Sequence, residues 1–297
     1  MENPKVSICA VAHKVDEDLI SFIDQVYAKT VSTFEVIISD NSEDCSVTSY
    51  LMSKNLDDLI VITNHQNLGL GWGMHRAFKQ AKGEYILRCD VDIDIPKSWD
   101  WNLIKYLEKY PELGAIGPMN EGHGYHKKWD TKDYIETDIL ITYCEMIPRR
   151  TIEHMNKFYK IPLMKDIYQG YPSVFNGIEL YHNYSGGYPD PNMFYGGEDF
   201  DQSLAIRYSG LRLGMAPDVF VKHKERSVNP EWSNKRAEWV GNSFRYYREK
   251  WSRILNFYDW SEMWDCLEPQ ILYMKRCGLE VSHESEYWKK VLSKEKK

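Results

Sequence analysis

Short, almost wholly apolar runs alternate with segments of helical periodicity along the first part of the chain. The runs Val6 to Val11, Phe34 to Ser39 and Leu59 to Thr63 predict strands buried on both faces, as in a parallel sheet. Between them, apolar residues recur at helical spacing from Glu17 to Lys29, and a second helix is expected around Val47 to Asn55. This alternation is typical of an α/β fold with a parallel sheet.

The same alternation continues after the third strand. Asn64 to Gly73 predicts a loop, and Met74 to Lys82 predicts a helix. The apolar run Glu84 to Cys89 predicts the next strand, Trp99 to Lys109 a further helix, and Gly114 to Pro118 another short strand. We therefore expect a Rossmann-like, mostly parallel sheet that is flanked by helices.

The second half of the chain is less regular. Ile139 to Ile147 predicts a strand, antiparallel at the edge of the sheet, and Asn176 to Tyr195 has the composition of a functional loop. Glu198 to Ser209 predicts a helix and Leu211 to Val221 a strand. Beyond Pro230 the pattern is aromatic and amphipathic, which predicts a helical tail.

Composition and charge restrict the class of protein. The chain has 297 residues, and its net charge of -7 argues against general nucleic-acid binding. Six cysteines without a C-x-x-C pair indicate reduced thiols rather than disulfides or a zinc site. Because Met1 to Pro4 lacks signal-peptide features and no apolar stretch is long enough to span a membrane, we expect a soluble, cytoplasmic protein. Peripheral membrane contact and homo-oligomerisation stay open.

Two carboxylates, Asp90 and Asp92, follow directly after the strand that ends at Cys89. Side chains alternate along a strand, so a bend at its end is needed for both to converge on one ion. Two hard oxygen ligands in this place suit a divalent cation that holds phosphates. Taken alone, the triplet Asp90-Val91-Asp92 is a weak signal, because surface turns often produce it.

Four polar features fall at the carboxyl ends of predicted strands, where parallel sheets bind ligands. They are Asp40, Asn67 to Gly69, Asp90 with Asp92, and His223. Each has a structural alternative, namely a turn residue, a tight loop or a surface imidazole. Their joint position at one edge of the sheet favours a ligand site.

Together these motifs resemble the family 2 glycosyltransferases, which have the GT-A fold. The resemblance is carried by Val6 to Ile8, Asp40 to Asp44, Asn67 to Ala77, Gly83 to Asp92 and Gly197 to Asp201, in the family's order and spacing. No single one of these motifs is specific, whereas the series is.

The resemblance implies a domain organisation. Residues 1–225 would form the GT-A catalytic domain, with a nucleotide-sugar half at about 1–118 and an acceptor half at about 119–225. Residues 226–297 would form a C-terminal helical extension.

The resemblance also implies a donor site along the strand ends. Ala10, Val11 and Ala12 would wall the base, and Asp40 would accept a hydrogen bond from a uracil- or thymine-like N–H, which favours a UDP- or dTDP-sugar. The other implied donor contacts are Asn67, Gly69, Asp90, Val91 and Arg76. Arg76 is alternatively a surface charge of its helix.

By the same resemblance, Asp92, Asp90 and His223 would ligate Mn²⁺ or Mg²⁺, which neutralises the leaving diphosphate. Asp94 offers a third nearby carboxylate, so spacing alone leaves open which two carboxylates of the three bind the metal.

Glu198 and Asp199 match the family's acidic pair at the start of a helix. The resemblance implies that Asp199 is the general base toward an acceptor hydroxyl, with Glu198 beside it. The alternative is that both acids simply complement the helix N-terminus. A single in-line displacement would invert the anomeric configuration, and a retaining mechanism stays open on the same fold.

Acceptor contacts are expected from Tyr195, Gly197 and Trp129, because aromatic faces and exposed amides suit a sugar. In the tail, Lys250 or Arg248 is a candidate contact of the diphosphate. Arg88 is unusual inside its apolar run and requires a carboxylate partner.

The leading interpretation is a metal-dependent inverting glycosyltransferase that transfers a sugar from a nucleotide-diphosphate sugar to a glycan or glycolipid hydroxyl. One alternative is a catalytically silent nucleotide- or glycan-binding relative. A sugar nucleotidyltransferase is less favoured, since Ala12 to Asp16 lacks the glycine-rich phosphate loop of that class.

Overall fold

The computed structural model describes residues 3–119, 128–130, 133–141, 143–158, 174–175, 178–179, 187–224 and 230–255. The predicted tail beyond residue 255 and residues 176–177 and 180–186 of the predicted loop over 176–195 lie outside the described residues.

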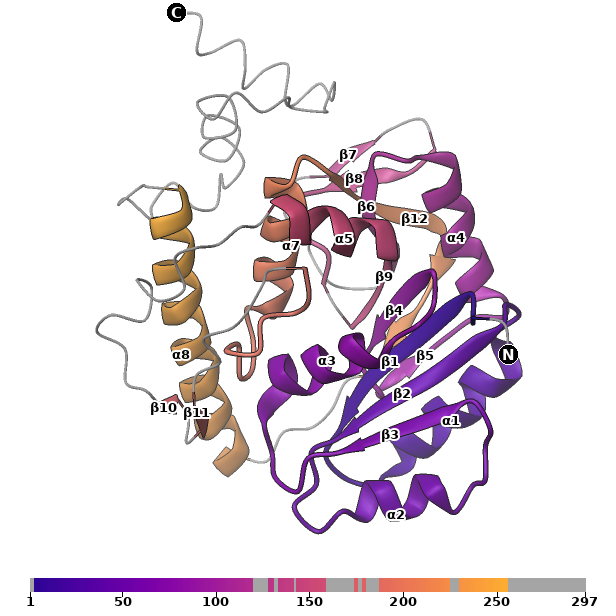
Figure 1. Cartoon of the computed structure of the whole chain (residues 1–297), viewed down its shortest axis with the longest axis vertical. Helices are drawn as coiled ribbons and strands as arrows, with labels where there is room; N and C mark the ends of the chain where they lie inside the picture. Colours follow the sequence, from indigo (N-terminus) through magenta and orange to yellow (C-terminus); the bar gives the residue numbers. More distant parts are fainter. Residues whose placement is uncertain are drawn as a thin grey trace, which may run out of the picture.

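The first part of the chain folds into alternating strands and helices (Figure 1). In chain order the elements are β1 (Val6–Ala12), α1 (Glu17–Lys29), β2 (Phe34–Asp40), α2 (Ser46–Met52), β3 (Leu59–Thr63), α3 (Gly69–Gln80), β4 (Tyr85–Cys89), β5 (Ile93–Asp94), α4 (Trp99–Lys109) and β6 (Leu113–Met119). The predicted order of strands and helices is confirmed here, and the two-residue strand β5 is an addition to it.

The second part contributes the remaining elements. They are β7 (Lys128–Asp130), β8 (Ile135–Thr137), β9 (Cys144–Pro148), α5 (Arg149–Phe158), β10 (Val174–Phe175), β11 (Ile178–Glu179), α7 (Glu198–Tyr208), β12 (Arg212–Phe220), β13 (Lys222–His223) and α8 (Pro230–Leu255). Among the helices of the described ranges, none combines the length and the apolar character that a membrane-spanning helix needs.

Nine strands form one mixed, mostly parallel sheet in the order β3-β2-β1-β4-β9-β6-β12-β8-β7. β1 pairs in parallel with both β2 and β4, and β12 pairs in parallel with β6. β9 is antiparallel to β4 and to β6, between which it lies. The prediction of an antiparallel strand near Ile139 to Ile147 was therefore right in direction but wrong in place. β9 is internal, and all five of its residues are buried.

Helix α3 begins at Gly69, five residues before the predicted start at Met74. Glycines disfavour helix, so local propensity predicts a loop here, and tertiary packing overrides it. A Cβ on Gly71 would lie 2.3 Å from the carbonyl oxygen of Met193, so only glycine lets that segment approach. The backbone amide of Leu70 donates to the carbonyl of Phe194 at 2.7 Å. The start of α3 is thus fixed by the chain segment that precedes α7.

Two apolar layers cover the sheet. One face carries Cys9, Ile37 and Ile86 and is covered by α3, α5 and α7, while the other carries Ile8 and Leu87 and is covered by α1, α2 and α4 (Figure 1). Helix α8 adds three fully buried or nearly buried aromatic residues to the first layer, which are Tyr246, Tyr247 and Trp251. Helix α8 therefore shares the core of the α/β sheet.

A buried ion pair network fastens α8 to this core. The ammonium group of Lys250 lies 2.8 Å from Asp190 and 2.8 Å from Asp201, and its side chain is 1% exposed. Tyr246 donates to Asp190 at 3.0 Å, and Trp251 donates to Asp201 at 2.7 Å. The suggested contact of Lys250 with a diphosphate is not supported, because two buried carboxylates already engage its ammonium group.

Replacing Lys250 should destabilise the protein strongly. Lys250→Met leaves Asp190 and Asp201 buried without their counter-charge, so we expect the free energy of unfolding to fall by about 3–5 kcal/mol. Urea unfolding followed by tryptophan fluorescence measures this loss. The matched control is Lys109→Met, whose side chain pairs with Asp133 at the surface and is 61% exposed. Equal midpoints for both variants would show that the buried network does not stabilise the fold.

Candidate active site

The chain reverses direction directly after β4. The backbone amide of Asp90 donates to the carbonyl of Tyr143 at 2.8 Å, and the chain then enters β5. β5 pairs antiparallel with β13, which places His223 opposite Ile93. The backbone amide of Lys224 donates to the carbonyl of Asp92 at 2.8 Å and closes the pairing. Residues far apart in sequence thereby meet at the end of β4.

Asp90, Asp92 and His223 form a cluster suited to one metal ion. Nε2 of His223 lies 3.2 Å from a carboxylate oxygen of Asp92 and 3.8 Å from one of Asp90. One ligand atom from each residue falls within 4.8 Å of the others, and all three side chains are half-buried. The imidazole also stacks on Tyr143, with ring centroids 5.3 Å apart. Two carboxylate oxygens and one imidazole nitrogen at this spacing fit Mn²⁺ or Mg²⁺ bound with water.

Asp94, the third candidate carboxylate, is bound elsewhere. It accepts a hydrogen bond from Gln25 at 3.2 Å and lies 3.5 Å from the ammonium group of Lys224. β5 thus turns Asp94 toward α1, and the cluster contains Asp90 and Asp92 but not Asp94.

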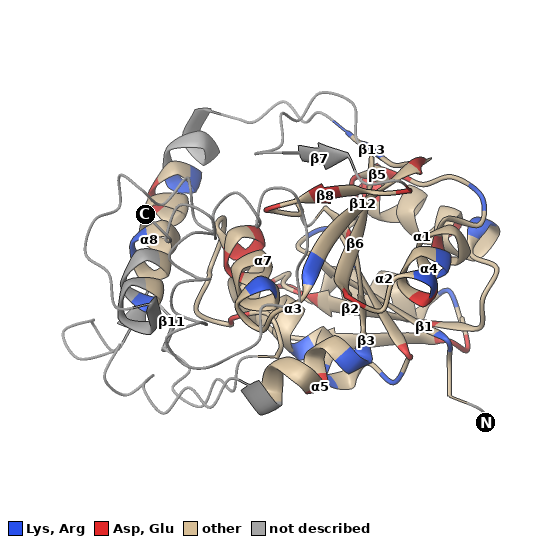
Figure 2. Ribbon diagram, turned by 90° about the horizontal axis from the view of Figure 1, so that it is seen from above, with Lys and Arg blue, Asp and Glu red and all other residues tan. Residues whose placement is uncertain are grey.

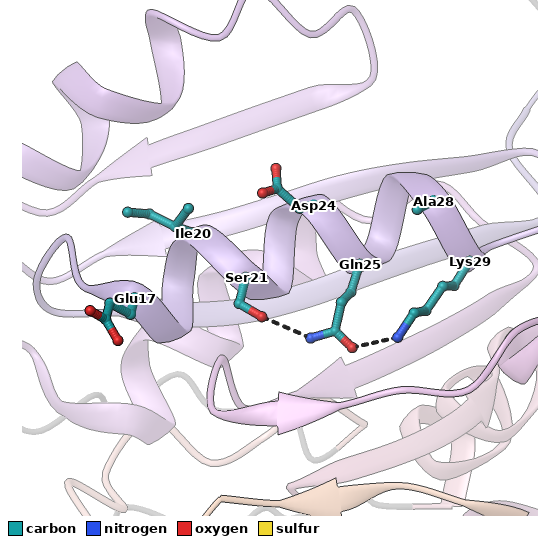
Figure 3. Close-up of a pocket in the computed structure, with 7 residues that line it drawn as sticks. All are labelled: Glu17, Ile20, Ser21, Asp24, Gln25, Ala28 and Lys29. Carbon is teal, nitrogen blue, oxygen red and sulfur yellow. Dashed lines mark hydrogen bonds between the residues drawn. The ribbon is translucent and has the colours of Figure 1, made fainter.

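Helix α1 supports this reversal of the chain. Figure 3 shows Ser21, Gln25 and Lys29 in a row along α1, joined by hydrogen bonds of 3.0 and 2.8 Å. The amide oxygen of Gln25 accepts from the backbone amide of Ile95 at 3.1 Å, and its amide nitrogen donates to the carbonyl of Ile93 at 3.3 Å. The surface pocket drawn there contains none of the predicted site residues. This face of α1 therefore acts as a scaffold for β5.

The cluster is electrostatically strained without a cation. Burial and then the neighbouring Asp92 carboxylate raise the pKa of Asp90 to about 6, while Arg88 and His223 act in the opposite direction. Glu198 adds to the increase, which shows that the start of α7 lies within electrostatic reach of the cluster. A bound divalent cation relieves this repulsion.

The acid pair lies in the first turn of α7, which Figure 2 shows as an acidic segment. Gly196 and Gly197 precede it with φ angles of +81° and +84°, a conformation that favours glycine. Asp199 is half-buried, and burial together with the adjacent Glu198 carboxylate raises its pKa to about 7. A carboxyl group with such a pKa is suited to accept a proton near neutral pH.

Arg88 has the carboxylate partner that its position in an apolar strand requires. Its side chain is fully buried, and its guanidinium lies 3.5 Å from Glu198 and donates to the amide oxygen of Gln202 at 3.1 Å. Glu145, opposite Arg88 in the pairing of β4 with β9, is also fully buried. Sequence reasoning missed Glu145. The sequence signal that could have identified it is its position as a lone acid within the apolar strand Cys144–Pro148.

Asp40 is placed differently from the role that the resemblance implied. It is fully buried, and its two carboxylate oxygens accept hydrogen bonds from the backbone amides and the hydroxyl groups of Ser42 and Thr48, at 2.5–2.9 Å. With this many donors satisfied inside the protein, Asp40 fits its structural alternative, a turn residue that also fixes the start of α2.

The other predicted donor residues lie along the ends of β1, β3 and β4. The side chains of Ala10 and Ala12 belong to the buried core, so only their backbone atoms can line a base. Asn67 accepts a hydrogen bond from the backbone amide of Gly69 at 3.0 Å, at the start of α3. Arg76 donates to Asn64 at the end of β3, and Val91 is half-buried between the two metal-ligand candidates.

Two of the three predicted acceptor residues lie near the acid pair. Tyr195 and Gly197 immediately precede α7, and the pKa of Tyr195 is raised by burial and by the charges of Asp90, Glu198 and Asp92. The guanidinium of Arg236 in α8 stacks 5.0 Å above the Tyr195 ring. Trp129 lies on the edge strand β7, separated from β4 by four strands of the sheet.

Substitutions in the cluster should change metal affinity. We expect Asp92→Asn to abolish Mn²⁺ binding and His223→Ala to weaken it by about tenfold or more, since even the partners of metal ligands contribute about 10–100-fold. Asp94→Asn is the matched control and should leave the affinity unchanged, because Asp94 binds Gln25 and Lys224. Isothermal titration with MnCl₂ measures all three. A loss in Asp94→Asn as large as in His223→Ala would contradict the assignment.

Comparison with known proteins identifies the family of this chain. The model described as glycosyl transferase family 2 matches residues 7–171. A relative from Haemophilus influenzae, described as an uncharacterized glycosyltransferase, is 30% identical over 124 residues, or 41% of this chain and 38% of the relative. The match thus spans well under half of that relative's length.

Two of the solved structures that are similar to this chain illustrate its fold. The mannosyltransferase PcManGT from Pyrobaculum calidifontis, in complex with GDP-Man and Mn²⁺, has a TM-score of 0.57 at 13% identity, with 99% of this chain and 79% of that chain covered. GalNAc-T7 with UDP, GalNAc and Mn²⁺ has a TM-score of 0.55 at 17% identity, with 92% and 57% covered. The family model matches more than half of the 297 residues, so the chain belongs to glycosyl transferase family 2 and has the GT-A fold.

Proposed function

We propose that the protein is a metal-dependent, inverting glycosyltransferase that transfers a hexosyl or deoxyhexosyl group from a nucleotide-diphosphate sugar to a hydroxyl group of a glycan or glycolipid. The observation that carries the proposal is the convergence of Asp90, Asp92 and His223 within 4.8 Å at the end of β4. The two solved structures described above were determined with Mn²⁺ and with a nucleotide or nucleotide-sugar, which supports the same ligand class here.

In this proposal the cluster holds Mn²⁺ or Mg²⁺. The ion supplies positive charge where the leaving diphosphate becomes more negative. Asp90 and Asp92 supply oxygen ligands, and His223 supplies Nε2, held in place by its stacking on Tyr143. Residues 1–118 would then bind the donor and residues 119–225 the acceptor, while α8 completes the core.

Asp199 is the proposed general base. It would accept the proton of the acceptor hydroxyl as the hydroxyl oxygen attacks the anomeric carbon and the bond to the diphosphate breaks. Glu198, beside it, is held by Arg88 and would contact the acceptor, with Tyr195 and Gly197 lining the approach. One displacement of this kind inverts the anomeric configuration.

In this proposal the nucleotide base would be recognised by groups other than Asp40. The preference for UDP or dTDP rested on Asp40, whose carboxylate is buried and bonded to Ser42 and Thr48. The backbone at Ala10 and Ala12, together with Asn67, would then line the base. The test therefore covers several nucleotides.

A thermal-shift series tests the donor site. UDP, dTDP, GDP and CMP are each measured with and without Mn²⁺, and a ligand that binds the native state at 100 times its Kd stabilises it by about 2.7 kcal/mol. We expect one nucleoside diphosphate to raise Tm only with Mn²⁺, and Asp92→Asn to lose that shift. If no nucleotide raises Tm, the donor proposal fails and the silent-relative interpretation replaces it.

The role of Asp199 is tested separately. Asp199→Asn should lower kcat by about 10²–10⁴-fold, as expected for loss of a general base, and leave the Kd of the nucleotide unchanged. The assay is release of nucleoside diphosphate from the sugar nucleotide that matches the stabilising nucleotide. Asp218→Asn, a surface acid that bonds Tyr106 at 2.7 Å, is the control. Loss of nucleotide affinity in Asp199→Asn would make the residue a binding group instead.

The pH profile gives a second check on the same assignment. A base must be ionised to accept a proton, and burial with Glu198 raises the pKa of Asp199 to about 7. At saturating Mn²⁺, kcat/KM should therefore rise with pH through about 7 and level off above it. The residual rate of Asp199→Asn should lack this rise.

A further inference from the structure

A layer of buried polar side chains lies beneath the acid pair. Arg88 on β4 and Glu145 on β9 are register partners, and both are fully buried. They lie on the face of the sheet that α7 covers, beside Ile86 and Ile147 of the core. Charged residues are almost never fully buried unless paired, so their position in the centre of the sheet calls for a reason.

The hydrogen bonds of this layer are incomplete. Among the described residues, twelve buried side-chain nitrogen or oxygen atoms have no hydrogen-bond partner, and six of them are here. The six are Nε and Nη2 of Arg88, both carboxylate oxygens of Glu145, Oε2 of Glu198 and Nε2 of Gln202. Buried polar groups usually have partners, so this concentration sets the layer apart from the rest of the described core.

Charge makes Arg88 the common counter-ion of three acids. The pKa of Glu145 is raised to about 7, mainly by burial. The positive charge of Arg88 opposes this increase, and the negative charge of Asp199 adds to it. Arg88 also lowers the pKa of Asp199 and lies 3.5 Å from Glu198. One guanidinium on β4 therefore acts on carboxylates from both β9 and α7.

The contacts of Arg88 with α7 determine how the helix is rotated about its axis. Glu198 and Gln202 are four residues apart and lie on the same face of the helix, and the guanidinium of Arg88 contacts both. Two contacts on successive turns fix the rotation of the helix about its axis. Asp199 is next to Glu198, so its direction is determined by that rotation.

Arg88 also connects this helix to the metal cluster. Asp90 follows Arg88 by two residues at the end of the same strand. The separation between the proposed base and the proposed metal ligands is thus set through one strand and one side chain.

We propose that Arg88, with Glu145 as its buried counter-charge, is a positioning residue that holds the Glu198–Asp199 pair in line with the metal cluster. The role of Asp199 rests on the proposed function, whereas the contacts of Arg88 with Glu198 and Gln202 in the first turns of α7 do not. The two are therefore tested by different measurements.

The main test is the double variant Arg88→Met/Glu145→Met, because removing both charges avoids leaving Glu145 buried opposite an uncharged residue of β4. We expect the Mn²⁺ affinity to stay within about threefold of the wild type and kcat to fall about 100-fold, as for a misplaced reacting group. Arg88→Lys, which keeps the charge but loses the planar fork, should give an intermediate kcat.

The control is Arg207→Met/Asp138→Leu, which removes another buried ion pair of α7, of 2.5 Å, away from the acid pair. It should lower Tm and leave kcat unchanged. A general effect of buried charge would instead lower kcat equally in both double variants, and that result would overturn the proposal.

Crystal structures of the wild type and of Arg88→Met/Glu145→Met provide the readout that does not depend on activity. We expect the Glu198 and Asp199 side chains to be displaced in the variant. Unchanged positions would overturn the proposal even if kcat falls. If Asp199→Asn retains wild-type activity, the proposed base is wrong, and displacement of Glu198 in the variant still decides whether Arg88 holds the start of α7.

Discussion

The antiparallel pairing of β13 with β5 is the constraint on which the candidate active site depends. It brings His223 opposite Ile93, and so beside two carboxylates that precede it by more than a hundred residues in the chain. A ribbon of two residues per strand is not stable alone. It is held here by Gln25 of α1 and by Lys224, which lies 3.2 Å from Asp18. The arrangement of Asp90, Asp92 and His223 is therefore an outcome of how α1 packs.

The second feature of the site is its concentration of carboxylates. Burial, Asp92 and Glu198 raise the pKa of Asp90 to about 6, and burial and Glu198 raise that of Asp199 to about 7. Arg88, beneath the acid pair, supplies a fixed positive charge against this repulsion. In the proposed enzyme a divalent cation at the cluster would supply a second one. The charge of Arg88 belongs to the chain and is present whether or not the metal is bound.

Much of the fold could be predicted from the sequence because the first four strands are local apolar runs. Features that depend on tertiary contacts could not. The internal place of β9 follows from which strands pair, and no local pattern encodes that. The start of α3 at Gly69 depends on the approach of Met193, which overrides the low helix propensity of glycine.

The candidate site, too, could be predicted from local motifs only where tertiary contacts do not decide the outcome. Asp90, Asp92 and His223 were predicted as metal ligands and converge, but that Asp94 turns away is decided by Gln25. Asp40 was assigned to base recognition from a motif, and its bonds to Ser42 and Thr48 were not visible in the sequence. A motif fixes where the chain presents a side chain, and its partners determine what that side chain can do.

Helix α7 illustrates how a functional segment is held when its own sequence does not favour stability. It starts after two glycines with positive φ and carries acids that burial penalises. Buried polar contacts hold its first turns from two sides, Asp201 toward Lys250 of α8, and Gln202 with Glu198 toward Arg88 of β4. Such contacts are directional, whereas apolar packing tolerates rotation and sliding. In the proposed enzyme the second residue of this helix would face the acceptor, and for such a role direction matters more than the stability that an apolar replacement would give.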